Sequence, residues 1–374
     1  MNQAVNLAES KPHYEILDGL RGVAALLVVF FHLLETHSLG NHYNQIINHG
    51  YLAVDFFFML SGYVIMYAYD DRWNQMSLKD FFKRRLIRLH PMIIIGMIIG
   101  AILFYFQYAP GLGWGRIHDI PVWKMLLVMV IGFTLIPVGK GLDIRGWSEM
   151  HPLNGPAWSL FYEYIANIVY AVFLRRVTKV FLAVLVLIAA GVTIHYALTN
   201  PNGDLIGGWS IAPEQLRIGF TRLAFPFLAG MLLAKTAKLR YTRNAFLSAS
   251  LLLVLFLSIP RIGGSEQHWM NGVYECFCLM VVFPVVVWLG AGGKVKGKRA
   301  SGLCKFLGDI SYPIYITHFP IINMYMAWVK NNNLNLAESW HVGLLCAVIS
   351  VALAYISMKL YDMPVRSWLR KRFL

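Results

Sequence analysis

The sequence predicts an all-α protein, a polytopic bundle of about ten transmembrane helices plus a short, partly buried helix in an external loop. Of the 374 residues, 57% are hydrophobic and only 14% are charged, whereas a soluble domain carries about 25% charged residues. Apolar runs recur along the whole chain, and a membrane span needs roughly 20 such residues. Because no long polar block separates the runs, we expect residues 1–374 to form a single membrane domain.

The apolar runs define the elements in chain order. The ten candidate spans are residues 16–38, 50–69, 90–108, 157–174, 180–198, 215–234, 245–260, 272–290, 308–329 and 340–361. The first run is too long for the core of a signal peptide, so we expect it to be retained as the first helix. A further apolar stretch, residues 123–136, is shorter and lies between Pro121 and Pro137, which limit its extension.

The basic residues decide how this shorter stretch is placed. They cluster at residues 72–88, 175–179, 235–243, 294–305 and 366–372. If the short stretch does not cross the membrane, all five clusters lie on one side, as the positive-inside rule favours. We therefore predict ten spans, both termini in the cytoplasm, and residues 109–156 as an external excursion. Within the first cluster, residues 77–89 alternate apolar and basic residues, which predicts an amphipathic helix lying on the inner leaflet.

The charge and cysteine content exclude several classes of protein. A net charge of +14 could indicate nucleic-acid binding, but the basic residues occupy short loops that suit anionic membrane lipids. We therefore expect membrane lipids, and no nucleic acid, as partners. The four cysteines lack the spacing of metal ligands, so we expect neither a bound metal nor a disulfide.

Ionisable residues inside a span are costly and mark functional candidates. The first span holds Arg21 and His32, eleven residues apart. At about 100° per residue they lie within roughly 20° of one face and about 16 Å apart along the helix axis. Asp18 shares that face one turn before Arg21, and we expect the two to pair.

Three further polar residues are predicted at a depth similar to that of His32. Asp55, Glu163 and His318 lie in the second, fourth and ninth spans, which suggests a buried catalytic chamber. Other interpretations remain for each. His32 could pack between helices, Asp55 and Glu163 could belong to structural ion pairs, and His318 suits a supporting role better than a catalytic one.

A second constellation lies in the segment after the second span. Arg85 and Arg88 are three positions apart in the sequence and so share a helix face. They can present two guanidinium forks to one phosphorylated group. Because Arg21 is predicted near the same side of the membrane, the three arginines together predict a phosphate clamp.

Several motifs in order resemble those of the acyltransferase-3 family. They are LDGLRGVAALLVVFFH, GYLAVDFFFMLSGYVI, FFKRRLIRLHP, PAWSLFYEY and LGDISYPIYITHFP, and the resemblance covers residues 17 to about 364. It includes Arg-x10-His at Arg21 and His32, and Arg-x-x-Arg at Arg85 and Arg88. The family consists of bacterial inner-membrane proteins that O-acylate surface carbohydrates, such as lipopolysaccharide, and some small metabolites. Some members carry a fused SGNH hydrolase-like domain, which we do not expect in this chain.

The resemblance implies an acyl-CoA co-substrate, usually acetyl-CoA, with no permanently bound cofactor, and a hydroxyl acceptor on an envelope carbohydrate or lipid-linked glycan. The three arginines would hold the donor phosphates, and His32 would remove the proton from the acceptor hydroxyl. Asp55 or Glu163 would orient His32, and a transient acyl-histidine is the competing chemistry. Further supporting or acceptor-side candidates are Asp18, Ser61, Trp158 and His318.

Two other classes of function remain open at this stage. A proton-coupled carrier of an envelope precursor or small metabolite could use midplane histidines and carboxylates, although no inverted repeat supports it. A non-catalytic scaffold in envelope synthesis would leave the buried polar residues unexplained. The sequence specifies neither the acceptor nor the oligomeric state.

Overall fold

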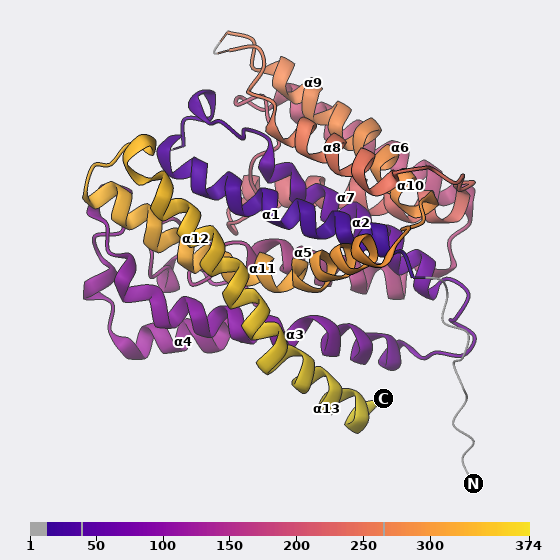
Figure 1. The fold of residues 1–374 in the computed structure, drawn as a ribbon, viewed down its shortest axis with the longest axis horizontal. Helices are drawn as coiled ribbons and strands as arrows, with labels where there is room; N and C mark the ends of the chain where they lie inside the picture. The colour runs from indigo at the N-terminus through magenta and orange to yellow at the C-terminus, as the bar shows by residue number, and fades with distance from the viewer. Residues whose placement is uncertain (1–12, 39, 265) are drawn as a thin grey trace.

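The computed structural model describes residues 13–38, 40–264 and 266–374, and these residues form a helical bundle without a β-strand (Figure 1). The long helices of the bundle are α1 (Glu15–Ser38), α2 (Ala53–Tyr69), α3 (Leu78–Leu103), α5 (Ala157–Val172), α6 (Lys179–Thr199), α7 (Pro213–Thr236), α8 (Ala245–Ser258), α9 (Trp269–Phe277) continued by α10 (Phe283–Gly292), α11 (Lys298–Asn331) and α12 (Leu336–Ser357). Two further helices are α4 (Val122–Phe133) and α13 (Met363–Phe373).

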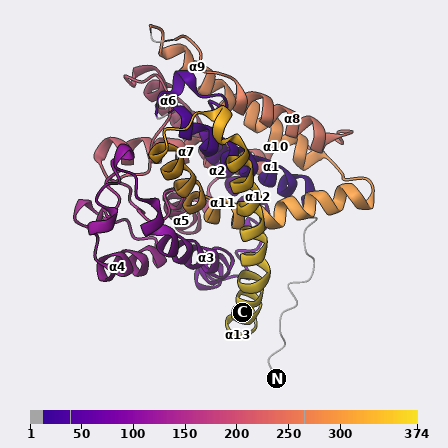
Figure 2. The same ribbon diagram turned by 60° about the vertical axis from the view of Figure 1, so that its left-hand side comes forward.

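Short helical turns connect or interrupt these elements. The 3₁₀ turns are His42–Asn44, Gly50–Leu52, Phe104–Gln107, Pro110–Leu112, Ile117–Asp119, Lys140–Leu142 and Leu174–Arg176, and the π-helical turns are Cys278–Val282 and Met358–Asp362. The π turns join α9 to α10 and α12 to α13 without a break in the chain direction (Figures 1 and 2).

The predicted polytopic helical fold is confirmed. Within the described residues, seven helices are long and apolar enough to cross a membrane. The shorter apolar helices are α4 with 12 residues and α8 with 14. Helix α5, with 16 residues, is also shorter than a full span, and α11 is not among the seven. The number of ten crossings therefore remains a prediction.

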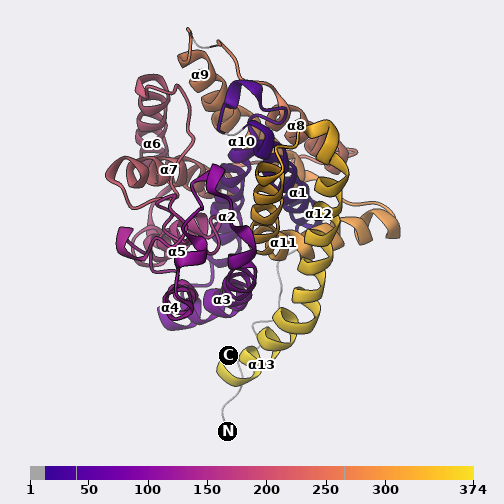
Figure 3. The same cartoon turned by 90° about the vertical axis from the view of Figure 1, so that its left-hand side faces the viewer.

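We call the end of the bundle that holds the start of α1, the start of α3 and α13 the basic end, and the other end the loop end. The loop end carries α4, which packs beside α3, and residues 134–156 (Figures 1 and 3). The short helix expected in residues 123–136 is thus present as α4 and ends at Phe133.

Small residues let the central helices approach closely. At Gly22, a Cβ atom would lie 2.4 Å from the carbonyl oxygen of Leu307, so α1 and α11 meet backbone to backbone. At Gly62, a Cβ atom would lie 2.0 Å from the carbonyl oxygen of Phe227, which joins α2 to α7 in the same way. Close approach at glycine is the usual means of packing membrane helices. It fixes α1, which bears Arg21 and His32, against α11.

The helix predicted at residues 77–89 is present, but it is not separate from the following span. Helix α3 runs without interruption from a capping box formed by Ser77 and Asp80, through Pro91, to Leu103. On the polar side of its first half, Arg85 is buried and bonds to Glu163 of α5. Alternating basic and apolar residues suit the wall of a polar cavity as well as they suit a membrane surface, and the sequence alone did not separate the two.

Candidate active site

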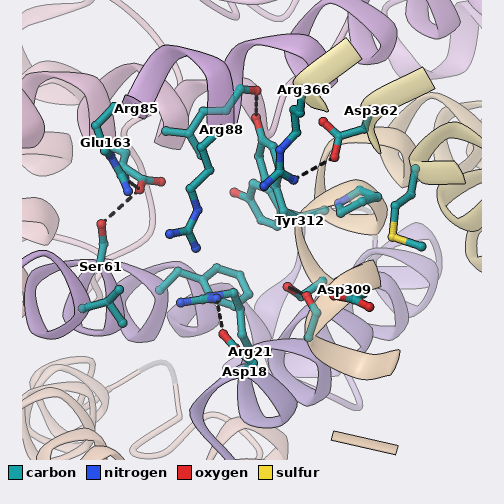
Figure 4. A pocket seen from close by; sticks show the side chains of 18 of the residues that line it. Asp18, Arg21, Ser61, Arg85, Arg88, Glu163, Asp309, Tyr312, Asp362 and Arg366 are labelled. Carbon is teal, nitrogen blue, oxygen red and sulfur yellow. Dashed lines mark hydrogen bonds and ion pairs between the residues drawn. The ribbon is translucent and has the colours of Figure 1, made fainter. Parts of the chain in front are cut away.

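A cavity of about 880 Å³ lies at the basic end, within the size range of small-molecule sites. Side chains from α1, α2, α3, α5, α11 and α13 line it (Figure 4). Its mouth is lined by exposed residues that include Glu15, Arg370 and Lys371. Its inner half is largely apolar and is formed by Val54, Phe57, Phe58, Leu160 and Tyr315. The cavity can therefore take an elongated ligand with a charged end and an apolar end.

Three arginines from two helices point into the polar part of this cavity. Arg21 donates to Asp18 at 2.8 Å, which is the predicted pair. Arg85 donates to Glu163 at 2.9 Å. Arg88 makes no side-chain hydrogen bond or ion pair with any described residue, and its side chain extends towards Arg21 in Figure 4.

The structure thus brings the predicted donor residues together in one space, with Ser61 and Glu163 beside them. The Ser61 hydroxyl donates to Glu163 at 3.0 Å. Glu163 therefore bonds to Arg85 and Ser61 and is not a partner of His32, as the sequence analysis expected it could be. Its position corresponds to the alternative interpretation, an ion-pair member.

His32 lies deeper along α1 and is not among the described residues that line the cavity. Its Nδ1 atom lies 2.8 Å from a carboxylate oxygen of Glu35. Its ring stacks on His318, with centroids 5.6 Å apart, and makes an edge contact with Phe319 at 5.0 Å. His318 in turn lies 6.2 Å from the ring of Tyr315.

Tyr315 is part of the apolar wall of the cavity. Its hydroxyl group lies 2.7 Å from the Ser159 hydroxyl, and both residues line the cavity. His32 is therefore separated from the cavity by two consecutive ring contacts, first Tyr315 with His318 and then His318 with His32.

Asp55 occupies a different site from the one the sequence analysis expected. It is fully buried and bonds to Arg222, with the shortest contact at 2.6 Å. The Arg222 guanidinium also lies 5.1 Å from the Trp158 ring centroid. Asp55 and Trp158 thus belong to an arginine clamp between α2, α5 and α7. The partner of Asp55 could not be predicted from the sequence, because it depends on how α2 is rotated against its neighbours.

Several residues at these sites were not predicted. Glu35 stands three residues after His32, a spacing that places both on one helix face and could have identified it. Arg366 and Arg370 line the cavity, although the sequence analysis treated their cluster as a basic segment after the last span. The signal for them was weaker, because the same spacing suits a helix lying on lipid.

The loop end holds another buried polar group. The Arg145 side chain lies 3.4 Å from the Glu149 carboxylate and 4.9 Å from the ring of Trp114. Burial raises the pKa of Glu149 to about 7, although the nearby Arg145 cation opposes the shift. Burial also lowers the pKa of His151 to about 3, so this side chain is neutral at neutral pH. No group of three or more potential metal ligands occurs in the part of the chain that the structure describes.

The fold and the site define a class of protein, a multi-pass helical membrane protein with a basic cavity and a partly buried histidine, His32, further along α1. The chain belongs to the acyltransferase family whose model is described as "Acyltransferase domain" and matches residues 14–359. This confirms the resemblance found in the sequence.

Curated relatives span different parts of the chain. "Protein 2 in picA locus" of Rhizobium radiobacter is 33% identical over 179 residues, covering 46% of this chain and 88% of the relative. "Acyltransferase MdmB" of Streptomyces mycarofaciens is 25% identical over 365 residues, covering 90% of this chain and 87% of the relative. "O-acetyltransferase OatA" of Staphylococcus aureus is 22% identical over 371 residues, covering 94% of this chain and 57% of its own length. The chain thus spans little more than half of OatA. No solved structure matches the chain.

Proposed function

We propose that this protein is an O-acyltransferase that takes its acyl group from an acyl-CoA, with acetyl-CoA the simplest donor, and transfers it to a hydroxyl group of a cell-envelope glycan. The observation that carries the proposal is the cavity that gathers Arg21, Arg85 and Arg88 on the same side of the bundle from which α1 leads to His32. In this arrangement the basic end faces the cytoplasm of a bacterium, where acyl-CoA is available, and the loop end faces outward across the inner membrane.

The arginines suit the phosphates of CoA. A guanidinium group presents planar, paired donors to phosphate oxygens. Arg88 has no partner among the described residues, so its donors are available, and the Nε atom of Arg85 is buried without a hydrogen-bond partner. The apolar inner half of the cavity suits the pantetheine arm and the thioester. The arm would reach His32 past Tyr315, whose hydroxyl would part from Ser159.

His32 and Glu35 would carry the chemistry. Glu35 accepts from the Nδ1–H group, which leaves Nε2 free to remove the proton from the acceptor hydroxyl. The acceptor oxygen then attacks the thioester carbonyl, the C–O bond forms and the C–S bond breaks. The departing thiolate takes the proton from the imidazolium, and the Glu35 carboxylate stabilises that cation while it exists. An acyl group carried briefly on Nε2 is the competing route.

The test is release of CoA by the purified protein, supplied with acetyl-CoA and lipid-linked envelope glycans. We expect His32→Ala to lower the rate by about 10²–10⁴-fold, the usual contribution of a general base. His195→Ala, a change at an exposed histidine of α6, serves as the matched control and keeps the wild-type rate. Release by folded His32→Ala protein at the wild-type rate would remove His32 from the mechanism.

The orienting role of Glu35 has a separate readout. We expect Glu35→Gln to lower turnover by up to about 10⁴-fold, as when the carboxylate of a Ser-His-Asp triad becomes an amide. Donor affinity stays unchanged, because Glu35 is not among the described residues that line the cavity. Equal loss of donor affinity and turnover would instead indicate a general change in structure.

A further inference from the structure

We propose that α13 forms a second anion-binding subsite in the same cavity, and that this subsite binds the 3′-phosphate of CoA. The inference rests on the proposed function, and it makes the enzyme specific for intact CoA. Donors that lack this phosphate, such as 3′-dephospho-CoA or phosphopantetheine, would fill only the inner arginine site.

One face of α13 forms part of the cavity wall. The residues of this helix that line the cavity are Met363, Arg366, Ser367, Arg370 and Lys371. Counted from Met363, the other four lie three, four, seven and eight positions further along the chain. This spacing places all five on one face of the helix. The Arg372 side chain, on the same helix, is exposed and is not among the described residues that line the cavity.

Contacts at both ends of α13 hold this face in place. At its start, Arg366 bonds at 2.9 Å to Asp362, which is 2% exposed and itself lines the cavity. At its end, the Lys83 ammonium group of α3 donates to the carbonyl oxygen of Phe373 at 3.2 Å. Figure 4 shows Arg366 and Asp362 beside Tyr312, across the cavity from Arg85 and Glu163. The helix is therefore attached to the wall that also carries Arg85 and Arg88.

The cationic groups of the cavity fall into two sets. The inner set is Arg21, Arg85 and Arg88, and the set at the mouth includes Arg370 and Lys371. Neither Arg370 nor Lys371 forms an ion pair with a described side chain, so both keep their charge and donors free. Counted over the described residues, seven arginines and lysines and five carboxylates line the cavity, which leaves it net positive.

Two separate sets of cationic side chains match a ligand with two separate anionic groups. In CoA, the ribose lies between a diphosphate and the 3′-phosphate. Acyl-CoA entering with its thioester first would place the diphosphate at the inner arginines and leave the 3′-phosphate at the mouth. A basic helix lying on lipid is the structural alternative, but in that case the cavity-facing and outward-facing basic residues of α13 would be equivalent.

The experiment compares CoA with 3′-dephospho-CoA by isothermal titration calorimetry on the full-length protein in nanodiscs. We expect the wild type to bind CoA roughly 10- to 100-fold more tightly, as for charge-assisted hydrogen bonds. The double variant Arg370→Ala/Lys371→Ala binds CoA as weakly as dephospho-CoA and leaves the affinity for dephospho-CoA unchanged. Arg372→Ala, the matched control, keeps the wild-type preference.

The outcomes separate the two proposals. Equal affinity of the wild type for CoA and dephospho-CoA overturns the subsite and leaves the acyl-CoA donor in place. Equal weakening of both ligands by the double variant, or loss of preference in Arg372→Ala, also overturns it, because a general surface charge would then be responsible. Failure of the wild type to bind either ligand overturns the proposed donor itself.

Discussion

Arg222 and Arg88 both belong to long helices of the bundle, but their surroundings differ. Arg222 bonds to both carboxylate oxygens of Asp55 and to the backbone carbonyl oxygens of Gly207 and Tyr51. Both members of the ion pair are almost completely buried, with 2% and 0% of their side chains exposed. Arg88 faces the cavity and has no such bonds to the described residues.

The difference lies in how many hydrogen-bond donors remain for a ligand. The clamp at Arg222 satisfies its charge within the protein, so its removal should affect folding. The arginines of the cavity keep unused donors, so their removal should affect binding. Arg145 at the loop end is intermediate, because its Nε atom donates to the carbonyl oxygen of Pro152 while both terminal nitrogens are buried without hydrogen-bond partners. Three predictions test this distinction.

The largest effect is expected at the clamp. Arg222→Ala leaves the carboxylate of Asp55 buried without its partner, which costs about 3–5 kcal/mol of stability. The melting temperature in detergent measures this loss, and Arg217→Ala, at an exposed position of the same helix, is the matched control. A wild-type melting temperature combined with weakened CoA binding would assign Arg222 to the donor site instead.

A smaller, pH-dependent effect is expected at Glu149. Its pKa is raised from the ordinary 4.5 to about 7, mainly by burial. Between these values the folded state holds a proton that the unfolded state has released, so stability falls as the pH rises through this window. The total loss is no more than about 3 kcal/mol.

The check is the melting temperature between pH 5 and pH 8. We expect a smaller decline for Glu149→Gln than for the wild type, because the amide does not titrate. Glu214→Gln, at an exposed carboxylate of α7, should keep the wild-type slope. An unchanged slope in Glu149→Gln would show that another group is responsible.

The smallest change in free energy is expected at Arg88, and it concerns binding. Arg88→Ala removes charge-assisted hydrogen bonds worth about 1.5–3 kcal/mol, which raises the Kd for CoA roughly 10- to 100-fold. The melting temperature stays the same, since no described residue loses a partner. Calorimetry measures the Kd. Arg84→Ala is the matched control, because Arg84 is a neighbour that is not among the described cavity-lining residues. A lower melting temperature with an unchanged Kd would show that Arg88, like Arg222, stabilises the fold and does not bind the ligand.

The sequence by itself determined the helical membrane fold, the family and the three arginines that the fold gathers in one cavity. Apolar run lengths are a local property, and so is the position of a residue around its own helix. The common face of Arg21 and His32, the Asp18 pair and the shared face of Arg85 and Arg88 were therefore within reach of the sequence.

Only the tertiary structure decided which residues of different helices meet. Asp55 and Glu163 were both predicted near His32, but they bond to Arg222 and Arg85, while Glu35 on the same helix bonds to His32. The cationic face of α13 became part of a cavity only because that helix packs against α3. Periodicity fixes a face and an approximate depth within one helix. The partner across a bundle depends on the rotation and close approach of whole helices, as at Gly22 and Gly62, and these are set by packing over the entire chain.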